Sequence, residues 1–230
     1  MRVNVRPAST LAAVPDPAWP LVSHWIDEAP FPVERVNVTD EMGLDVLYRL
    51  QVTATSVLGA LALNCGGLLV NSGWFRILGG GSEGLADLAT ANHLPADPTT
   101  ADGVPGFLVV GYDVLGGRFA LDGGGLGVAP GEVCYFGPDA LTWQALGGGH
   151  SDFVHAALTG GLEDTFRELR WDGWEQEVSV LGPDTGLSLY PPPFSREGQD
   201  IGNVSRRPVP LAELHAFYED AADQLGPLDM

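Results

Sequence analysis

The chain has 230 residues, 45% of them hydrophobic, and carries six Trp, nine Phe and five Tyr, a composition that excludes a disordered chain and allows one large domain or two small ones. Its 30 acidic residues against 11 Arg and no Lys give a formal net charge of −19. A surface this acidic repels phosphate backbones and anionic lipids, so we expect neither nucleic-acid binding nor membrane binding.

The first third of the chain divides into an arm and a helical region. Residues 1–18 are rich in Ala, Pro and Val without a clear period, which predicts a loose N-terminal arm. The spacing of apolar residues and the capping residues then predict helices over residues 17–29, 41–49 and 53–63, with a strand over residues 33–38.

The stretch 58–84 is the one around which the rest of the chain is organised. An apolar helix runs into Asn64-Cys65-Gly66-Gly67, and we expect Gly66 and Gly67 to form a left-handed helix C-cap. Asn71-Ser72-Gly73 then separates the apolar runs LLV and WFRIL, which predicts an antiparallel hairpin. The hairpin is expected at the centre of the core.

The second half predicts strands that are covered by helices. Four short apolar runs are separated by glycine-rich turns, at residues 107–112, 118–121, 132–136 and 141–146. This spacing indicates an antiparallel meander. The other expected elements are helices over residues 85–92, 151–158 with Ser151 as the N-cap, 162–171 and 210–225, and a short strand over residues 178–181. The proline-rich loop 93–106 is not a domain boundary, since the residues after it hold too little helix for an independent core.

These elements together predict an α+β fold: a single domain over residues 19–230, with a mixed, mainly antiparallel sheet packed by helices. Cys65 and Cys134 lie in apolar contexts, which is typical of small buried side chains rather than of a disulfide framework. The chain shows neither a signal-peptide pattern nor an apolar run of membrane length, so we expect a cytoplasmic protein. No motif indicates a cofactor.

One motif points to a hydrolase. The segment 80–84, GGSEG, matches G-x-S-x-G between a predicted strand and a predicted helix, the setting of a nucleophile elbow. The residues available to such a triad are Ser82, then Asp113 or Asp139, then His150 or His155. No HGGG-type oxyanion loop precedes the motif, and the alternating strands and helices of a hydrolase sheet are missing. A non-catalytic turn is therefore the competing interpretation.

Other motifs carry less chemistry. Gly79, Gly81 and Gly84 satisfy G-x-G-x-x-G, the dinucleotide fingerprint, but the βαβ unit that this fingerprint requires is missing. The run 123–127 (GGGLG) lacks the Lys of a phosphate loop and predicts a hairpin turn. His150 and His155 are separated by five positions, which turns them to different faces of a helix, unlike a zinc-binding i, i+4 pair. We therefore expect no metal site.

Two segments place Arg beside large aromatic residues. They are Gly73-Trp74-Phe75-Arg76 and Arg170-Trp171-Asp172-Gly173-Trp174. Arg stacked on Trp stabilises protein interfaces, and it also occurs in ordinary cores and at core edges. Both interpretations stay open: the pairs form a docking surface, or they are buried packing.

Several of these segments resemble an uncharacterised bacterial family, domain-of-unknown-function family 2625. The matching stretches are QVTATSVLGALALNCGGLLVNSGWFRILGGG, FLVVGYDVLGGRFALDGG, GEVCYFGPDALTWQAL with HSDFVHAALTGGL, and FRELRWDGWEQEV, which span about residues 51–178. The order of helix, N-x-G-G, hairpin and D-x-x-G-G meander is also similar to the SUKH superfamily of α+β proteins. Many SUKH proteins are immunity proteins that bind and block secreted toxins, often nucleases.

The resemblance implies a non-catalytic, cytoplasmic protein-binding module, of immunity type, whose partner is a basic, nuclease-like toxin. The charge of −19 would steer the chain toward a basic site, although a GC-rich or salt-adapted genome also explains the acidity. The alternatives are the serine hydrolase and a small-ligand or carbohydrate-binding module that uses exposed Trp. The binding residues expected from the shared motifs are Trp74, Arg76, Asp113, Tyr135, Asp139, Trp143 and Trp174. An exposed edge strand of the meander would permit a dimer.

Overall fold

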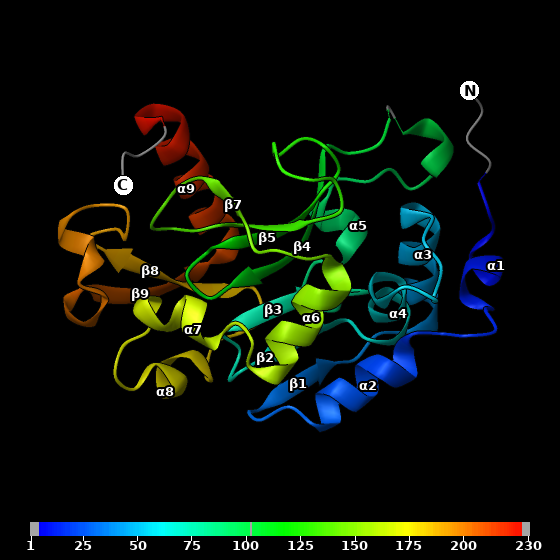
Figure 1. Ribbon diagram of the computed structural model, residues 1–230, viewed down its shortest axis with the longest axis horizontal. Helices are drawn as coiled ribbons and strands as arrows, with labels where there is room; N and C mark the ends of the chain where they lie inside the picture. The colour runs from blue at the N-terminus through cyan, green and yellow to red at the C-terminus, as the bar shows by residue number, and fades with distance from the viewer. Residues whose placement is uncertain (1–4, 102, 227–230) are drawn as a thin grey trace.

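A seven-stranded sheet forms the centre of the computed structural model, which describes residues 5–101 and 103–226 (Figure 1). The strands are β1 (Val33–Val36), β2 (Gly67–Val70), β3 (Phe75–Leu78), β4 (Phe107–Asp113), β5 (Arg118–Asp122), β6 (Val133–Phe136) and β7 (Trp143–Ala145). Their order in space is their order in the chain, and every neighbouring pair is antiparallel. The predicted α+β fold with a helix-packed, mainly antiparallel meander is confirmed.

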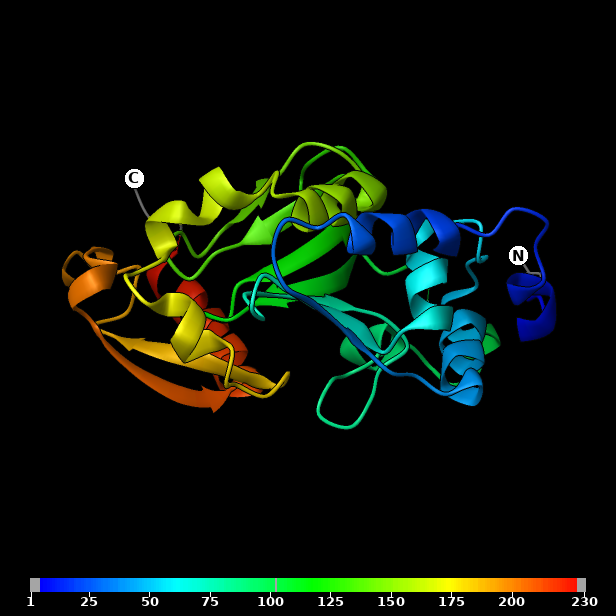
Figure 2. The same cartoon turned by 90° about the horizontal axis from the view of Figure 1, so that it is seen from below.

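Helices cover the sheet, and several of them pack together beside it at the end that carries the N-terminus. The helices of this part are α1 (Ala8–Ala12), α2 (Trp19–Asp27), α3 (Asp40–Leu50), α4 (Val57–Asn64), α5 (Leu88–Ala91), the 3₁₀ helix η1 (Pro98–Thr100) and α6 (His150–Thr159). Helices α2 and α6 lie over one face of the sheet (Figure 2), and α4 contacts both. Residues 57–62 of α4 are all buried, because this helix is apolar around its whole circumference.

The N-terminal segment differs from the loose arm that we expected over residues 1–18. Residues 1–4 lie outside the described part, but residues 8–12 form α1 and Leu11 is fully buried. Two backbone hydrogen bonds attach the segment to the residues before α4: Ala54 N–H donates to Leu11 O (3.0 Å), and Ala18 N–H donates to Ala54 O (2.8 Å). The arm therefore adds a small apolar layer outside α3.

The predicted central hairpin is confirmed as β2 and β3, which pair in register from Gly67 with Leu78 to Val70 with Phe75. The turn between them has positive φ at Asn71, Ser72 and Gly73. Asn is one of the few non-glycine residues that tolerate this conformation, so the turn chemistry was readable from the sequence.

The predicted C-cap at Gly66 and Gly67 is wrong. Helix α4 ends on Cys65, whose backbone is extended, and neither glycine has positive φ. The glycines are needed for space: a Cβ on Gly66 would lie 2.7 Å from Gly81 O, and one on Gly67 would lie 2.5 Å from Leu85 Cδ2. The sequence indicated the residue type correctly but for a different physical reason.

The C-terminal third mixes predicted and unpredicted elements. The helix expected over residues 162–171 is present as α7 (Glu163–Phe166) followed by the 3₁₀ helix η2 (Arg167–Leu169), and α9 (Leu211–Leu225) closes the chain. The sequence did not predict the helices α8 (Trp174–Val178), η3 (Glu197–Gln199) and η4 (Ile201–Asn203), or the strands β8 (Thr185–Tyr190) and β9 (Ser205–Pro210). Strands β8 and β9 form a separate antiparallel pair against α9 (Figure 1). The strand expected over residues 178–181 is wrong, since Val178 ends α8, whereas the closing helix is confirmed as α9.

The N-cap of α6 lies two residues before the predicted one. Ser151 was expected as the N-cap, but the helix begins at His150 and Gly149 is the N-cap, with its N–H donating to Asp152 Oδ2 (2.9 Å). Cys65 and Cys134 are free and buried. No helix within residues 5–101 and 103–226 combines the length and the hydrophobicity needed to cross a membrane.

Candidate functional site

Two of the predicted binding residues, Trp74 and Trp174, lie together where the first residue of α8 packs against the residue after the β2–β3 turn. Trp74 is fully buried, and its ring meets the ring of Trp174 edge to face, with centroids 5.0 Å apart. Trp171 lies on its other side at 6.0 Å. We call these three residues the tryptophan cluster. It joins the end of the β2–β3 turn to α8, and its members are at most 8% exposed.

Two arginines cover the tryptophan cluster. The guanidinium carbon of Arg170 lies 4.9 Å from the ring centroid of Trp74 and 4.4 Å from that of Trp174. The guanidinium carbon of Arg206 lies 4.6 Å from the ring of Trp171. A cation over an aromatic face is attracted by the electrons of the ring. Both guanidinium groups therefore make intramolecular contacts, and the side chains of Arg170 and Arg206 are only 10% and 19% exposed.

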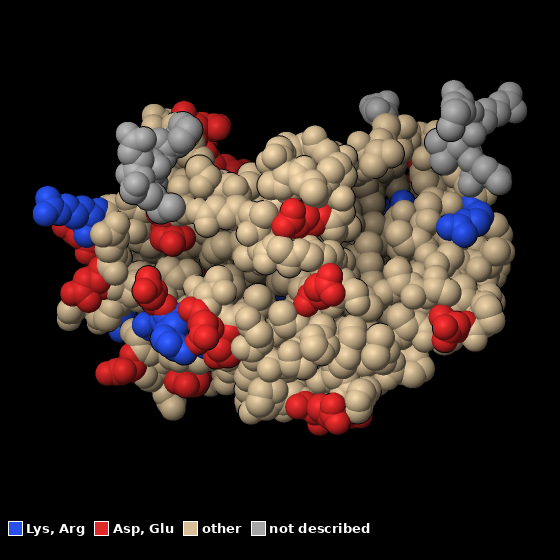
Figure 3. Space-filling model, viewed as in Figure 1, with Lys and Arg blue, Asp and Glu red and all other residues tan. Residues whose placement is uncertain are grey.

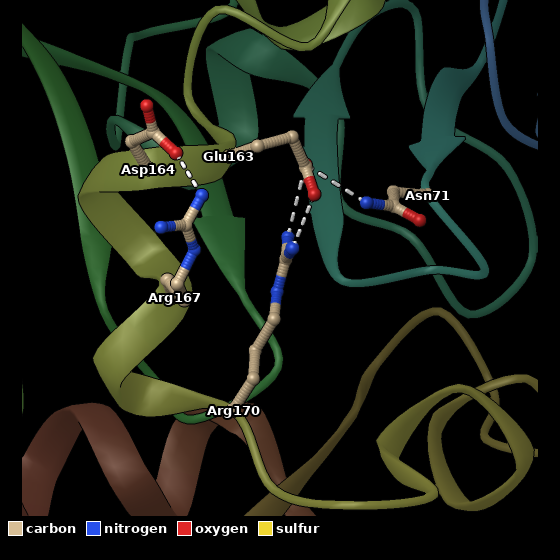
Figure 4. A network of polar contacts seen from close by, with 5 residues as sticks. All are labelled: Asn71, Glu163, Asp164, Arg167 and Arg170. Atoms are coloured by element: carbon tan, nitrogen blue, oxygen red, sulfur yellow. Dashed lines mark hydrogen bonds and ion pairs between the residues drawn. The ribbon is translucent and has the colours of Figure 1, made fainter.

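A polar network fixes this arrangement to the sheet (Figure 4). Glu163 on α7 pairs with both terminal nitrogens of Arg170, and its Oε1 also accepts a hydrogen bond from Asn71 Nδ2 (2.9 Å) in the β2–β3 turn. The bidentate geometry makes the Glu163–Arg170 pair a strong, oriented contact. The second pair of the network, Arg167 with Asp164, lies on the exposed side of α7.

Arg76, another predicted binding residue, is a buried brace rather than a surface group. It is 1% exposed and donates to Pro183 O (3.3 Å), Thr185 O (2.8 Å) and the carbonyl of Gly73. Burial lowers the pKa of Arg76 to about 10, which still leaves it charged at neutral pH. The side chain connects β3 to the start of β8.

Asp113 and Tyr135 form a second buried contact. Asp113 Oδ2 accepts a hydrogen bond from the Tyr135 hydroxyl (2.5 Å), and its Oδ1 accepts from the backbone N–H of Leu115 and Gly117 (2.8 and 2.9 Å). Burial raises the pKa of Asp113, against these hydrogen bonds, and burial also raises that of Tyr135. The pair closes the turn between β4 and β5.

The last two predicted binding residues, Asp139 and Trp143, lie away from the tryptophan cluster, near β7. Asp139 is exposed, and Trp143 is half-buried between Phe107 and Phe136, with both ring centroids 5.4 Å away. The structure thus distributes the predicted binding residues over three places: the tryptophan cluster with Arg76, the β4–β5 turn, and the β7 edge.

The structure does not bring the residues of the hydrolase alternative into a triad. Ser82 lies in a tight turn that is bridged to Leu85, and its Oγ donates to Glu83 O at 3.3 Å. His150 is buried, with no partner for either ring nitrogen among the described residues, while His155 is exposed beside Trp25. No imidazole nitrogen in the described part of the chain is hydrogen-bonded to Ser82. A nucleophile and its base are expected within hydrogen-bond reach.

The glycine fingerprint and a metal site find no support in the geometry either. A Cβ on Gly79 would lie 2.4 Å from Cys65 O, so this glycine serves the close approach of two chain segments. The strands on either side, β3 and β4, pair antiparallel, which is incompatible with a βαβ unit. Within the described ranges, no group of three or more His, Cys, Asp or Glu side chains is placed to hold a metal.

The feature that sequence reasoning missed lies outside the tryptophan cluster, on α7, η2 and α8. Five exposed acidic residues lie there: Asp164, Glu168, Asp172, Glu175 and Glu177. We call them the acidic face. The carboxylate of Glu177 also accepts hydrogen bonds from Trp171 Nε1 and Arg206 Nε, both at 3.1 Å. Residues 163–184 hold seven acidic residues and two Arg, a local net charge of −5. Red side chains gather over α7 and α8 at the lower left of Figure 3. The sequence showed the charges but not which of them point outward.

Comparison with known proteins places the chain among uncharacterised bacterial relatives. The model of a family described as "Protein of unknown function DUF2625" matches residues 8–214. A putative uncharacterised protein of Escherichia coli strain K12, YbfG, is 36% identical over 192 residues, which cover 81% of this chain and 85% of the relative. An uncharacterised protein of Haemophilus influenzae is 33% identical over 212 residues, 87% of this chain and 91% of the relative. No solved structure gave a significant match.

Proposed function

The chain belongs to the family of unknown function DUF2625, and we propose that it is a non-catalytic binding protein whose acidic face docks a basic protein partner. The observation that carries this proposal is the opposite orientation of the two charges. Arg170 and Arg206 fold inward onto tryptophan rings. Within the acidic face, Glu168, Asp172 and Glu175 are exposed and form no ion pair with any described residue.

The physical consequence is a concentrated negative potential over a rigid support. Arg167 is the one exposed Arg on α7, η2 and α8, all three of which are fully described, and it pairs with Asp164. Val180, just after α8, is 81% exposed and offers an apolar contact beside the charges. Complementary charge steers association and suppresses partners of the wrong sign. This chemistry fits a partner with a basic surface.

Within that class we favour a toxin with a basic active site, such as a nuclease, so that the chain would act as an immunity-type protein in the cytoplasm. Two observations support this choice: the layout of helix, hairpin and meander resembles the SUKH superfamily, and a nuclease site must attract phosphate, so it would also attract carboxylates. Docking of the acidic face over such a site would block it.

The two alternatives are less well supported by the contacts. The hydroxyl of Ser82 donates to a backbone carbonyl, and no described base is bonded to it, which does not favour a serine hydrolase. A carbohydrate module that stacks sugars on exposed Trp would need such residues, but none of the six Trp, all of which the structure describes, is in an exposed position. Dimerisation through an edge strand, β1 or β7, stays a prediction.

The test compares two variants with the same change in charge. One carries Glu168→Lys, Asp172→Lys and Glu175→Lys on the acidic face. The control carries Asp16→Lys, Asp27→Lys and Asp223→Lys, which are exposed residues elsewhere in the chain. Both are used as bait in lysate of the chain's own organism, at low and at moderate salt. A retained protein is then purified, and its affinity and nuclease activity are measured with each bait.

We expect the wild type and the control to retain one basic partner at low salt, and the acidic-face variant to bind it at least about tenfold more weakly. The affinity of the wild type should fall as salt rises. Equal loss in both variants would mean that only net charge matters, and it would contradict a specific face. Absence of any partner at either salt would contradict the proposal as a whole.

A further inference from the structure

A second surface lies at the other end of the sheet, and it is a cavity rather than a charged face. A cavity of about 440 Å³ opens between the end of α3, the loop before β4 and the adjoining ends of β4 and β5. The hollow is visible right of centre in Figure 3. Its walls are mainly apolar and include Leu50, Val52, Leu58, Val104, Leu108 and Leu121. We call it the α3–β5 groove, and its volume is in the range of small-molecule sites.

Hydrogen bonds hold the groove open. The loop before β4 is attached at its start, where Asn92 exchanges two hydrogen bonds with the backbone of Val109 (2.6 and 2.8 Å). It is attached again at its end, where Gly106 O accepts from the N–H groups of Gly123 and Gly125, both at 2.8 Å. The apolar walls cannot close on one another, so they stay in contact with water and lack van der Waals contacts. An apolar ligand in the groove would cover this surface and supply those contacts.

One charged residue in the wall is incompletely satisfied. Asp122, at the end of β5, is 2% exposed. Its Oδ1 accepts three backbone hydrogen bonds, from Gly124, Gly125 and Leu126 (2.8 to 2.9 Å), while its Oδ2 is buried without a donor in the described part of the chain. Burial would raise the pKa of Asp122, but the three N–H groups lower it below its usual value. A fixed carboxylate therefore keeps one acceptor atom without a donor.

Arg49, the positively charged residue in the same wall, already has partners within the protein. Arg49, in the last turn of α3, donates to Leu94 O and has one nitrogen 3.6 Å from Asp45. Asp122 forms no ion pair with any described residue. A ligand head group that meets Asp122 should therefore be a donor, and a chain with a net charge of −19 attracts cations.

We infer that the α3–β5 groove binds a small molecule with an apolar body and a protonated amine, with the body between α3 and β5 and the ammonium donating to Asp122 Oδ2. Gly124, in the turn that surrounds Asp122, has positive φ and open space around its Cβ position, so this turn has room to adjust to the head group. This site is separate from the acidic face, and neither proposal depends on the other.

The test uses three probes of one chain length: octylamine at neutral pH, where it is protonated, 1-octanol and octanoate. Binding to the full chain is measured by titration calorimetry, and the site is located by the methyl resonances of Val52, Leu58 and Leu108. The variants are Asp122→Asn, which keeps an Oδ1 acceptor and removes the charge, and Phe107→Ala at the mouth. The control is Leu21→Ala, an exposed residue of α2.

We expect saturable binding of octylamine, weaker binding of octanol and the weakest binding of octanoate. Asp122→Asn should weaken octylamine binding by about tenfold or more, because a hydrogen bond to a charged group is lost, and should leave octanol unaffected. Phe107→Ala should weaken both, and Leu21→Ala neither. Octylamine shifts elsewhere than these methyl groups would overturn the inference even if Asp122→Asn fails to fold. Equal affinity of wild type and Asp122→Asn would overturn it as well.

Discussion

Single residues in this fold show why a motif does not reveal exposure. Trp74 and Arg76 were expected as binding residues because they lie in a shared aromatic motif, and that motif is one of packing. Trp74 is the centre of the tryptophan cluster, and Arg76 spans β3 and the start of β8. Both are at most 1% exposed. Sequence periodicity identifies a strand but not whether the other face of that strand is covered by a later segment.

The role of Arg76 as a brace predicts a large effect on stability. In Arg76→Met the carbonyls of Pro183 and Thr185 lose their donor, so unfolding free energy should fall by about 3 kcal/mol. Arg167→Met, which removes only an exposed pair with Asp164, should change it by less than about 1 kcal/mol. Urea denaturation of the two variants measures both values. A small loss in Arg76→Met would mean that the carbonyls find other donors.

His150 and His215 predict a loss of stability in acid. Burial lowers the pKa of each imidazole to about 4 from 6.5. Below pH ~6.5 the imidazoles of the unfolded chain therefore bind protons, whereas those of the folded chain stay neutral until the pH approaches 4. Between pH 7 and pH 5 each should reduce the unfolding free energy by about 2 kcal/mol. Burial raises the pKa of Asp113, so this residue contributes a gain in unfolding free energy as the pH falls, opposite to the two histidines.

The contribution of His150 is isolated by comparing wild type with His150→Leu. The variant should lose less stability between pH 7 and pH 5, by about 2 kcal/mol, because one protonation site of the unfolded chain is gone. Urea unfolding at the two pH values gives the difference. An identical pH dependence in both proteins would show that His150 is accessible to protons in the folded state.

At the scale of the elements, the sequence predicted the local parts well and the distant parts poorly. The hairpin β2–β3, the strands from β4 to β7 and the helix α9 follow from local patterns of apolar residues and turn glycines. Strand β9 was missed because Pro208 and Pro210 argue against a strand, and α8 because five residues show no helical period. Each missed element gains its stability from tertiary packing: Trp174 of α8 lies on Trp74, and Val209 of β9 packs against α9.

The junction of α4 and β2 predicts a steric effect at one glycine. A Cβ on Gly66 would meet backbone oxygens at 2.7 and 2.9 Å, so Gly66→Ala should cost roughly 3 kcal/mol, since backbone on both sides must move. Gly202→Ala is the matched control, because the nearest atom to its Cβ would be 3.7 Å away; it should change stability by less than about 0.5 kcal/mol. Thermal or urea unfolding separates the two. Equal stability would mean that this junction is not closely packed in solution.

At the scale of the whole molecule, the fold was more predictable than the site. The meander has a local pattern, whereas the acidic face depends on which way α7, η2 and α8 turn, and the α3–β5 groove depends on a loop that was expected to have no regular structure. The direction of a charged side chain is decided by its tertiary partners. Glu163 and Glu168 look alike in sequence, yet the first holds Arg170 and the second faces water.

The order of strands in the sheet also bears on how the chain acquires its structure during synthesis. Because strands β1 to β7 lie side by side in the order in which they are made, each new strand leaves the ribosome next to an edge that already exists. No strand of this sheet has to be inserted between two earlier ones, and contacts between sequence neighbours form with little loss of chain entropy. Phe136 of β6 is covered later than its own sheet forms, because it packs in a small core with Leu214 and Tyr218 of α9, which are made after all seven strands of the sheet.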